Sequence, residues 1–211
     1  MKGGGYETDG TIPGSVYSFL LNKNLMPDPY YRDNEEKVLA ICDNDFEFSR
    51  KFDYKKESDD ITLVLEGIDT LCDIILNGKK IAHLNNMHRA YKIPVGDIIA
   101  NGENFISAYF YSADKYVKEV DKKNPRPGCA NPLKGYMHLR KAHCMFGWDW
   151  GPRLPDAGIW RDIYLVDETE PRIDDVRILQ RHENGKVFVK VTAKTTKSAD
   201  VKITGDFTVI F

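Results

Sequence analysis

The segment CDIILNGKKIA, residues 72–82, places an Asn-Gly pair between two apolar runs. Asn77 and Gly78 both tolerate the positive φ that a type I′ turn requires, and the twist of this turn matches that of two antiparallel strands. The pair therefore predicts a β-hairpin with strands at residues 72–76 and 79–82. This local signal constrains the fold more than any other in the chain.

Strand-like patterns recur on both sides of this hairpin. In residues 46–54 aromatic side chains alternate with polar ones, which is typical of a half-buried strand. Further strands are predicted at residues 61–65, 91–95, 104–111 and 159–166. A short helix is predicted within residues 15–24, and residues 32–36 are predicted as a solvated turn. Residues 112–137 form a long connection with one helical turn, whose charged part (residues 119–126) is expected to be mobile.

These patterns predict an all-β protein with two domains. Residues 1–11 are glycine-rich and polar and are expected to be a flexible leader, and residues 12–170 are expected to form a β-sandwich. A new pattern begins at residue 171, with predicted strands at residues 173–178, 187–191 and 200–204. The spacing resembles that of an immunoglobulin-like sandwich, which needs about seven strands. Only three or four fit before Phe211, so residues 171–211 are predicted to be an incomplete immunoglobulin-like domain.

Composition excludes several classes of function. The 30 Lys and Arg residues nearly balance the 32 Asp and Glu residues, which gives no field for nucleic acid or an anionic membrane. No apolar run approaches the roughly 20 residues of a membrane span, and no signal peptide is evident, so a soluble, cytoplasmic chain is expected. The four cysteines are expected to be free thiols. The spacing of His138, His143 and Cys144 fits no common zinc site, and neither a metal nor another cofactor is expected.

The stretch from His138 to Arg161 is the best candidate for a functional segment. It contains all three tryptophans of the chain, and its glycines and prolines exclude a helix. An irregular aromatic segment of this kind commonly presents a surface. Indole faces beside a carboxylate (Asp149) and a guanidinium (Arg153) suit a sugar, whose C–H face stacks on the ring while its hydroxyls bond to the charged groups. The alternative is that the tryptophans fill one end of a sandwich core, and the residue types alone do not decide between the two.

Four motifs occur in an order that identifies a resemblance. They are PGSVYSFLL (13–21), PDPYYRDNE (27–35), LVLEGIDTLCDIILNGKKI (63–81) and FGWDWGPRLPDAGIWRDIYL (146–165). Together they resemble the N-terminal region of the β-mannosidases of glycoside hydrolase family 2, over about residues 12–211. The WDWGPR motif is the most diagnostic, because β-galactosidases and β-glucuronidases of the same family generally lack it. Residues 1–10 match nothing in that family pattern, and the strand that the family pattern places before Pro13 is expected to be missing.

The resemblance implies a jelly-roll, galactose-binding-like β-sandwich followed by an immunoglobulin-like domain and a (β/α)8 barrel. In that family two glutamates of the barrel hydrolyse the glycoside with retention, one as acid/base and one as nucleophile. Both would lie beyond Phe211, so no catalytic residue is expected in this chain. Asn34-Glu35 resembles the Asn-Glu pair of the family's acid/base only superficially, since it stands in a different domain and motif.

The resemblance also implies a role for the tryptophan stretch. In relatives the matching loop reaches over the barrel and shapes the subsite for the terminal mannose. Asp149 would accept hydrogen bonds from sugar hydroxyls, and Trp150 and Trp148 would form apolar walls. Arg153 would orient Asp149 or the loop, and residues 32–34 would brace it. Trp148 could equally be structural, and Trp160, on the expected return strand, is predicted to lie in the core.

Three functions are therefore considered. The first is an accessory domain of a β-mannosidase, inactive alone, whose partners are the barrel and a terminal β-mannoside or manno-oligosaccharide. The second is an independent carbohydrate-binding module, and the third is a structural domain that only docks on the barrel. A wall with one acid and one or two indoles should bind a sugar more weakly than millimolar, which favours the first. The three differ in whether Asp149 and Trp150 are exposed and convergent.

Overall fold

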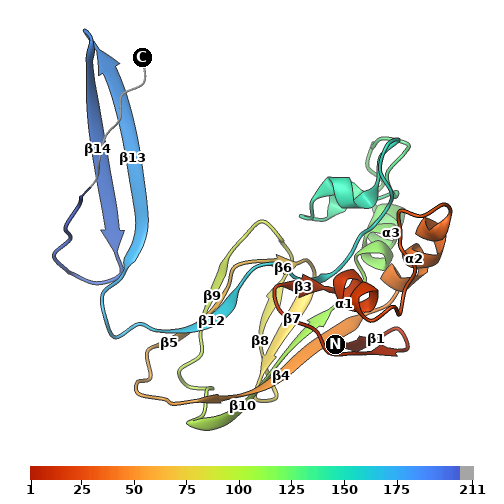
Figure 1. Cartoon of the computed structure of the whole chain (residues 1–211), viewed down its shortest axis with the longest axis horizontal. Helices are drawn as coiled ribbons and strands as arrows, with labels where there is room; N and C mark the ends of the chain where they lie inside the picture. Colours follow the sequence, from red (N-terminus) through yellow and green to blue (C-terminus); the bar gives the residue numbers. More distant parts are fainter. Residues whose placement is uncertain (205–211) are drawn as a thin grey trace. The chain divides into compact units, whose positions relative to one another are not determined.

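The computed structural model describes residues 1–204, which divide into two compact units, Met1–Val166 and Asp167 onward. The boundary falls four residues before the predicted one. Each unit has its own secondary structure (Figure 1), and the first contains the hydrophobic core. None of the helices in the described part of the chain is long and apolar enough to span a membrane.

The first unit is a β-sandwich, as predicted. Its largest sheet has six strands, in the order β2 (Tyr6–Glu7), β1 (Lys2–Gly3), β4 (Phe46–Tyr54), β10 (Gly102–Phe110), β7 (Cys72–Leu76) and β8 (Lys79–Leu84). Two further sheets have three strands each. The first has the order β3 (Gly14–Ser15), β11 (Gly158–Ile159) and β6 (Ile68–Asp69). The second has the order β12 (Ile163–Asp167), β5 (Ile61–Leu65) and β9 (Tyr91–Pro94). The core joins the long strands of the large sheet to β5, whose five residues are all buried.

The predicted Asn-Gly hairpin is confirmed. Asn77 and Gly78 have φ values of 50° and 79°, and β7 pairs antiparallel with β8 on either side of them. The Asn77 side chain also donates to the carbonyl of Ile98 and accepts from the backbone amide of Phe105. The turn is therefore bound to the start of the neighbouring strand β10 as well as closing its own hairpin.

The expected flexible leader is wrong for residues 2–7. β1 and β2 form a small hairpin, and β1 adds to the edge of β4 with Lys2 opposite Glu47 and Gly3 opposite Phe46. Gly3 has no Cβ, and an added one would lie 2.2 Å from the carbonyl oxygen of Asp45. The glycines therefore permit a close backbone approach, and their presence is no sign of a loose tail.

Helical structure is more extensive than predicted. The short helix α1 (Val16–Asn22) is confirmed, and α2 (Asn34–Cys42) replaces the second half of the predicted solvated turn. α2 buries Val38, Ile41 and Cys42, a helical spacing that continues beyond the charged residues of the turn. The connection after β10 forms the three-turn helix α3 (Ala113–Lys123), so most of the charged segment expected to be mobile is helical.

Ser112 explains where α3 begins. Its hydroxyl accepts a hydrogen bond from the backbone amide of Lys115, which is the geometry of an N-cap. Asp114 in the first turn and Lys122 and Lys123 in the last turn suit the helix dipole. Two 3₁₀ helices, η1 (Tyr136–His138) and η2 (His143–Phe146), follow before the tryptophans.

The predicted return strand at residues 159–166 is split into β11 and β12. The break contains Trp160, which was predicted to lie in the core but is 38% exposed. The Arg161 guanidinium stacks 4.2 Å from the centre of its ring, and the ring packs over Gly67. The cation and the glycine both lie against the indole, so the side chain is partly sheltered at the surface.

Up to residue 204, the secondary structure of the second unit is one long antiparallel hairpin, β13 (Ile173–Glu183) and β14 (Lys186–Thr195). Asn184 and Gly185 close it with φ values of 50° and 72°, the same turn chemistry as in the first unit. Two of the three predicted strands are therefore present, and residues 200–204 are not a strand. That this unit begins an immunoglobulin-like sandwich stays a prediction.

Candidate functional site

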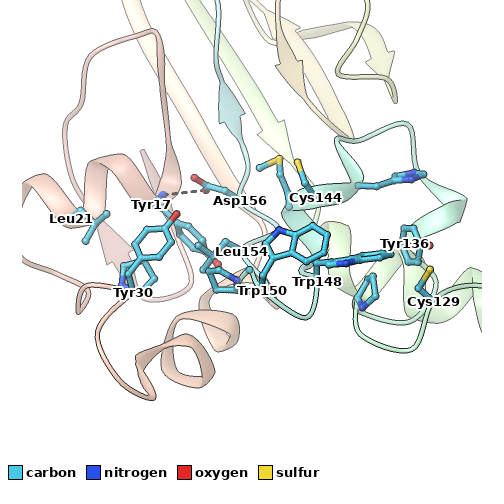
Figure 2. A pocket seen from close by; sticks show the side chains of 16 residues that line it. Tyr17, Leu21, Tyr30, Cys129, Tyr136, Cys144, Trp148, Trp150, Leu154 and Asp156 are labelled. Atoms are coloured by element: carbon cyan, nitrogen blue, oxygen red, sulfur yellow. Dashed lines mark hydrogen bonds between the residues drawn. The ribbon is translucent and has the colours of Figure 1, made fainter.

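An apolar cleft of about 850 Å³ runs along the tryptophan loop of the first unit. Figure 2 shows its side chains in a row, from Tyr30 past Trp150 and Trp148 to Tyr136 and Cys129. The remaining lining residues are Tyr17, Leu21, Pro29, Pro132, His143, Cys144, Met145, Gly151, Pro152, Leu154 and Asp156. The volume lies within the roughly 300–1,000 Å³ of small-molecule sites, which are commonly lined by aromatic groups with a few polar ones.

Trp148 and Trp150 lie on a tight backbone turn. The amide of Trp148 donates to the carbonyl of Gly151 over 3.0 Å, and the amide of Gly151 donates back over 3.3 Å. Trp148 and Trp150 therefore lie on the same loop with ring centres 5.5 Å apart, and they are 38% and 82% exposed. An indole left this open to water is expected to have a ligand or a partner.

Asp149 lies at the tip of this turn. It is exposed, and its carboxylate forms no hydrogen bond or ion pair with any of residues 1–204. Asp149 does not line the cleft, so of the four predicted residues the structure brings only Trp148 and Trp150 into it. Within the described part of the chain, the Asp149 carboxylate therefore keeps all of its acceptor capacity free.

Arg153 fixes the loop and is not bonded to Asp149. Its side-chain Nε and its backbone amide both donate to the carboxylate of Glu35, the second residue of α2, the latter over 3.0 Å. Partial burial raises the pKa of Glu35, but the hydrogen bonds and charge of Arg153 outweigh it and hold the pKa below its usual range. Residues 32–34 were predicted to brace the loop, but the contact with Arg153 is made by Glu35, the residue that follows them.

Glu35 was missed because its segment was interpreted as a solvated turn. The available signals were two acids followed by apolar residues at helical spacing, which mark the first turn of a helix. The helix α2 directs Glu35 toward the tryptophan loop, more than a hundred residues later in the chain. No local pattern indicates that pairing.

The opposite wall of the cleft comes from α1 and the loop after it. Leu21, Pro29 and Tyr30 line it, and Tyr30 is 76% exposed. The Asp28 carboxylate accepts the amide of Tyr30 over 2.9 Å, which fixes the backbone beneath the ring. In the sequence this segment was noted as part of the PDPYYRDNE motif (27–35), and no function was assigned to Tyr30. Its Pro-Asp-Pro-Tyr-Tyr pattern, with two exposed aromatic residues in a stiff loop, was the signal available.

Among the residues that the structure describes, Asp156 is the one acid that lines the cleft. Its Oδ1 accepts the backbone amides of Tyr17, over 3.1 Å, and of Ala157, over 2.7 Å. Burial raises its pKa to about 6, although these hydrogen bonds act in the opposite direction. Asp156 therefore joins the end of the tryptophan stretch to the first turn of α1.

A buried lysine fixes the start of the same stretch. Lys141 is fully enclosed, and its ammonium donates to the carboxylate of Asp69 in β6 and to the backbone carbonyl of Asp156. Removing one partner of a buried ion pair commonly costs about 3–5 kcal/mol, because the other charge is left uncompensated. Lys141 was not singled out in the sequence, where a lysine between Arg140 and Ala142 gives no sign of burial.

His143 and Cys144 both line the cleft, but they do not form a metal centre. Within residues 1–204 no three His, Cys, Asp or Glu side chains are grouped so that they could hold a metal ion. Tyr17 and Cys42 are bonded to each other beneath the cleft, and burial raises the pKa of both groups, that of Cys42 to about 12. These two groups stay protonated at neutral pH and are part of the core.

Known proteins share this architecture. The sequence profile of the family described as glycosyl hydrolase 2 galactose-binding domain-like matches residues 2–161. The chain therefore belongs to this family of β-sandwich domains from glycoside hydrolase family 2. The match begins at residue 2, so the first ten residues, which seemed unrelated to the family, are part of the domain.

The relatives narrow the class. A β-mannosidase of Bos taurus is 32% identical over 98% of this chain and 24% of its own length, and a probable β-mannosidase of Caenorhabditis elegans is 35% identical over 71% of the chain. The crystal structure of a β-D-mannosidase from Dictyoglomus thermophilum superposes with a TM-score of 0.80 at 34% identity, covering 87% of this chain and 23% of that one. The resemblance to β-mannosidases is thus confirmed. The chain spans about a fifth to a quarter of the length of these relatives.

A more distant structure agrees on the fold. An exo-chitosanase of Amycolatopsis orientalis superposes with a TM-score of 0.61 at 18% identity. At that identity the likeness shows the shared β-sandwich alone.

Proposed function

We propose that this chain is the non-catalytic sugar-binding domain of a β-mannosidase and that its tryptophan loop forms part of the subsite for the terminal mannose. The catalytic groups are two glutamates of a (β/α)8 barrel outside this chain, acting with retention of configuration. The observation that carries the proposal is the pairing of exposed indoles with an unbonded carboxylate at the tip of one fixed turn.

Each residue of the loop has a distinct part in this proposal. Asp149 accepts two sugar hydroxyls, and such charge-assisted bonds are worth about 1.5–3 kcal/mol each when water is excluded. Trp150 and Trp148 exclude that water and stack on the C–H face of the sugar. Arg153 acts at a distance, because its bond to Glu35 fixes the base of the loop. The barrel supplies the opposite half of the site.

Turnover in a polypeptide that joins this chain to its barrel tests the proposal. Asp149→Ala and Trp150→Ala should each lower kcat/KM for an aryl β-mannoside by about tenfold or more, since each removes transition-state binding of at least about 1.4 kcal/mol. Trp160→Ala is the matched control, because Trp160 lies outside the cleft, and it should leave kcat/KM unchanged.

Unchanged turnover in these variants would contradict the proposal. If Asp149→Ala and Trp150→Ala turn over the mannoside like the unaltered protein, the loop does not contact the substrate. The domain would then serve only as a structural support docked on the barrel.

A further inference from the structure

The long hairpin of β13 and β14 in the second unit (Figure 1) has two chemically different faces. Residues directly opposite each other in an antiparallel pair share a face, and successive residues of one strand alternate between the faces. One face is mainly apolar and includes Val176, Ile178, Val189 and Val191. A face of this kind suits the interior of a folded domain, which leaves the opposite face for water or a partner.

The opposite face of the hairpin is basic. The strand register places four cations on it, Arg177, Arg181, Lys186 and Lys190, against a single acid, Glu183. All of these residues are exposed. The chain as a whole has a formal net charge of -2, so its composition conceals this local excess of positive charge.

Most of these cations are free to bind a partner. Arg181 donates to the carboxylate of Glu183 over 2.9 Å, and its guanidinium lies 5.0 Å from the centre of the Phe188 ring. The side chains of Arg177, Lys186 and Lys190 form no ion pair with any of residues 1–204. An anionic partner therefore has to break no existing ion pair to reach them.

The four cations follow each other at a regular spacing along the hairpin. In the register Arg177 is the diagonal neighbour of Lys190. Arg181 is the diagonal neighbour of Lys190 on the other side, and also of Lys186. Diagonal neighbours in an antiparallel pair are about 7–8 Å apart. We call this row of Arg177, Lys190, Arg181 and Lys186 the basic stripe.

An extended polypeptide has nearly the same repeat. A strand rises about 3.3–3.4 Å per residue, so side chains two positions apart lie on one side of it at about 6.6–6.8 Å. A segment with an acid at every second position can therefore place one carboxylate beside each cation of the basic stripe.

Nucleic acid matches the basic stripe less well. Along a duplex the phosphates of one strand follow each other about every 3.4 Å, which is about half the spacing of the cations. Single strands gain affinity by stacking bases on open aromatic faces. The ring present on this face, Phe188, has the Arg181 guanidinium over it.

We propose that the basic stripe docks an extended acidic polypeptide segment with Asp or Glu at alternate positions. Its carboxylates meet the cations in turn. Leu179 and Phe188, which are 45% and 47% exposed on the same face, contact the apolar parts of the segment. This inference goes beyond the proposed function and does not depend on it, because it concerns the second unit alone.

Fluorescence anisotropy of a labelled peptide tests the docking in the 211-residue chain at low ionic strength. The probe has about twelve residues with Glu and Thr alternating. A peptide of the same composition, with all its Glu residues before its Thr residues, is the matched control, because when extended it presents only about half of its carboxylates on one side. The alternating peptide should bind about threefold more tightly or better. Its dissociation constant should rise by about tenfold or more when the salt concentration is raised about tenfold, because salt screens exposed charges.

Loss of single cations should weaken this binding in steps. Arg177→Gln and Lys190→Gln should each raise the dissociation constant of the alternating peptide by about threefold, and the double variant by about tenfold. Lys79→Gln removes the same charge from an exposed lysine of the first unit, which also forms no ion pair within residues 1–204, and should leave the dissociation constant unchanged. The backbone amide NMR signal of Gly185 reports in each variant that the hairpin is formed.

The peptide should shift the amide signals of β13 and β14 and leave those of the first unit in place. Equal affinity for the two peptides would show that only net charge is recognised and would overturn the proposal. Equal effects of Lys79→Gln and Lys190→Gln, or no binding of the peptide while the Gly185 signal is in place, would overturn it as well. Tighter binding of a thymidine oligonucleotide of the same charge would assign the basic stripe to nucleic acid instead.

Discussion

Asp156 shows how a single carboxyl links the candidate site to the stability of the fold. Within residues 1–204 it is the only acid that lines the cleft, and it accepts hydrogen bonds from two backbone amides while lying largely out of water. Burial dominates and raises its pKa from 3.8 to about 6. The charged form is therefore disfavoured in the folded state, and the protonated form is favoured.

The raised pKa of Asp156 determines in which direction the stability of the fold changes with pH. Because the pKa is higher in the folded chain than in the unfolded chain, the folded chain binds the extra proton between about pH 4 and 6. The contribution of Asp156 to stability is thus fully present below about pH 4 and is lost as the pH rises through 6. The amount is on the order of 3 kcal/mol.

Asp156→Asn should remove this dependence. The amide oxygen can still accept from Tyr17 and Ala157, so the variant should be as stable as the unaltered chain at pH 7 or more so. The free energy of unfolding of both proteins is measured in urea at pH 4.5 and pH 7. The difference in this free energy between the variant and the unaltered chain should narrow or reverse at the lower pH. An identical difference at both pH values would show that Asp156 does not titrate in this range.

At the scale of elements, the two Asn-Gly turns carry the clearest sequence signal. Both have positive φ at both positions, and a Cβ added at Gly78 or Gly185 would meet nothing within 4 Å. A substitution at either glycine therefore acts through the backbone conformation alone. β-branched residues strongly disfavour positive φ, so the effect of valine can be attributed to the turn.

Gly78→Val should lower the free energy of unfolding of the first unit by about 1–2 kcal/mol. All three tryptophans lie in this unit, so denaturant unfolding followed by tryptophan fluorescence reports on it. Gly185→Val makes the same change in the second unit and should leave this transition where it is. If Gly78→Val leaves the unfolding midpoint unchanged, the type I′ turn does not contribute to the stability of the first unit.

Strands were predicted from sequence more successfully than helices. The period of two in residues 46–54 and the Asn77-Gly78 turn are local features, and both are confirmed. α2 was missed, and α3 was predicted only as a single helical turn, because their apolar residues are few and their charged residues resemble those of a solvated loop. Each is stabilised mainly by tertiary contact, as with Val38 and Val117, which are completely buried.

At the scale of the whole chain, the cleft joins segments that are far apart in sequence. The tryptophan loop was predicted because its residue types are unusual and its motif resembles that of a known family. Tyr30 and Glu35 could not be placed beside it, since their pairing with the loop depends on how α1 and α2 pack on the sandwich. The exposure of Trp150 and the half-exposed surface position of Trp160 likewise follow from the path of the backbone and not from residue type.

The central claim is that Trp148 and Trp150 contact a sugar and Trp160 does not. The chain has three indole N–H groups, so ¹⁵N-labelled protein gives three separate NMR signals, and even binding weaker than millimolar shifts those in contact. Titration with mannose should move the signals of Trp148 and Trp150 together along one saturable curve and leave Trp160 in place. Mannose that moves none of the three, or Trp160 as much as the others, would contradict the assignment of the tryptophan loop to a sugar site.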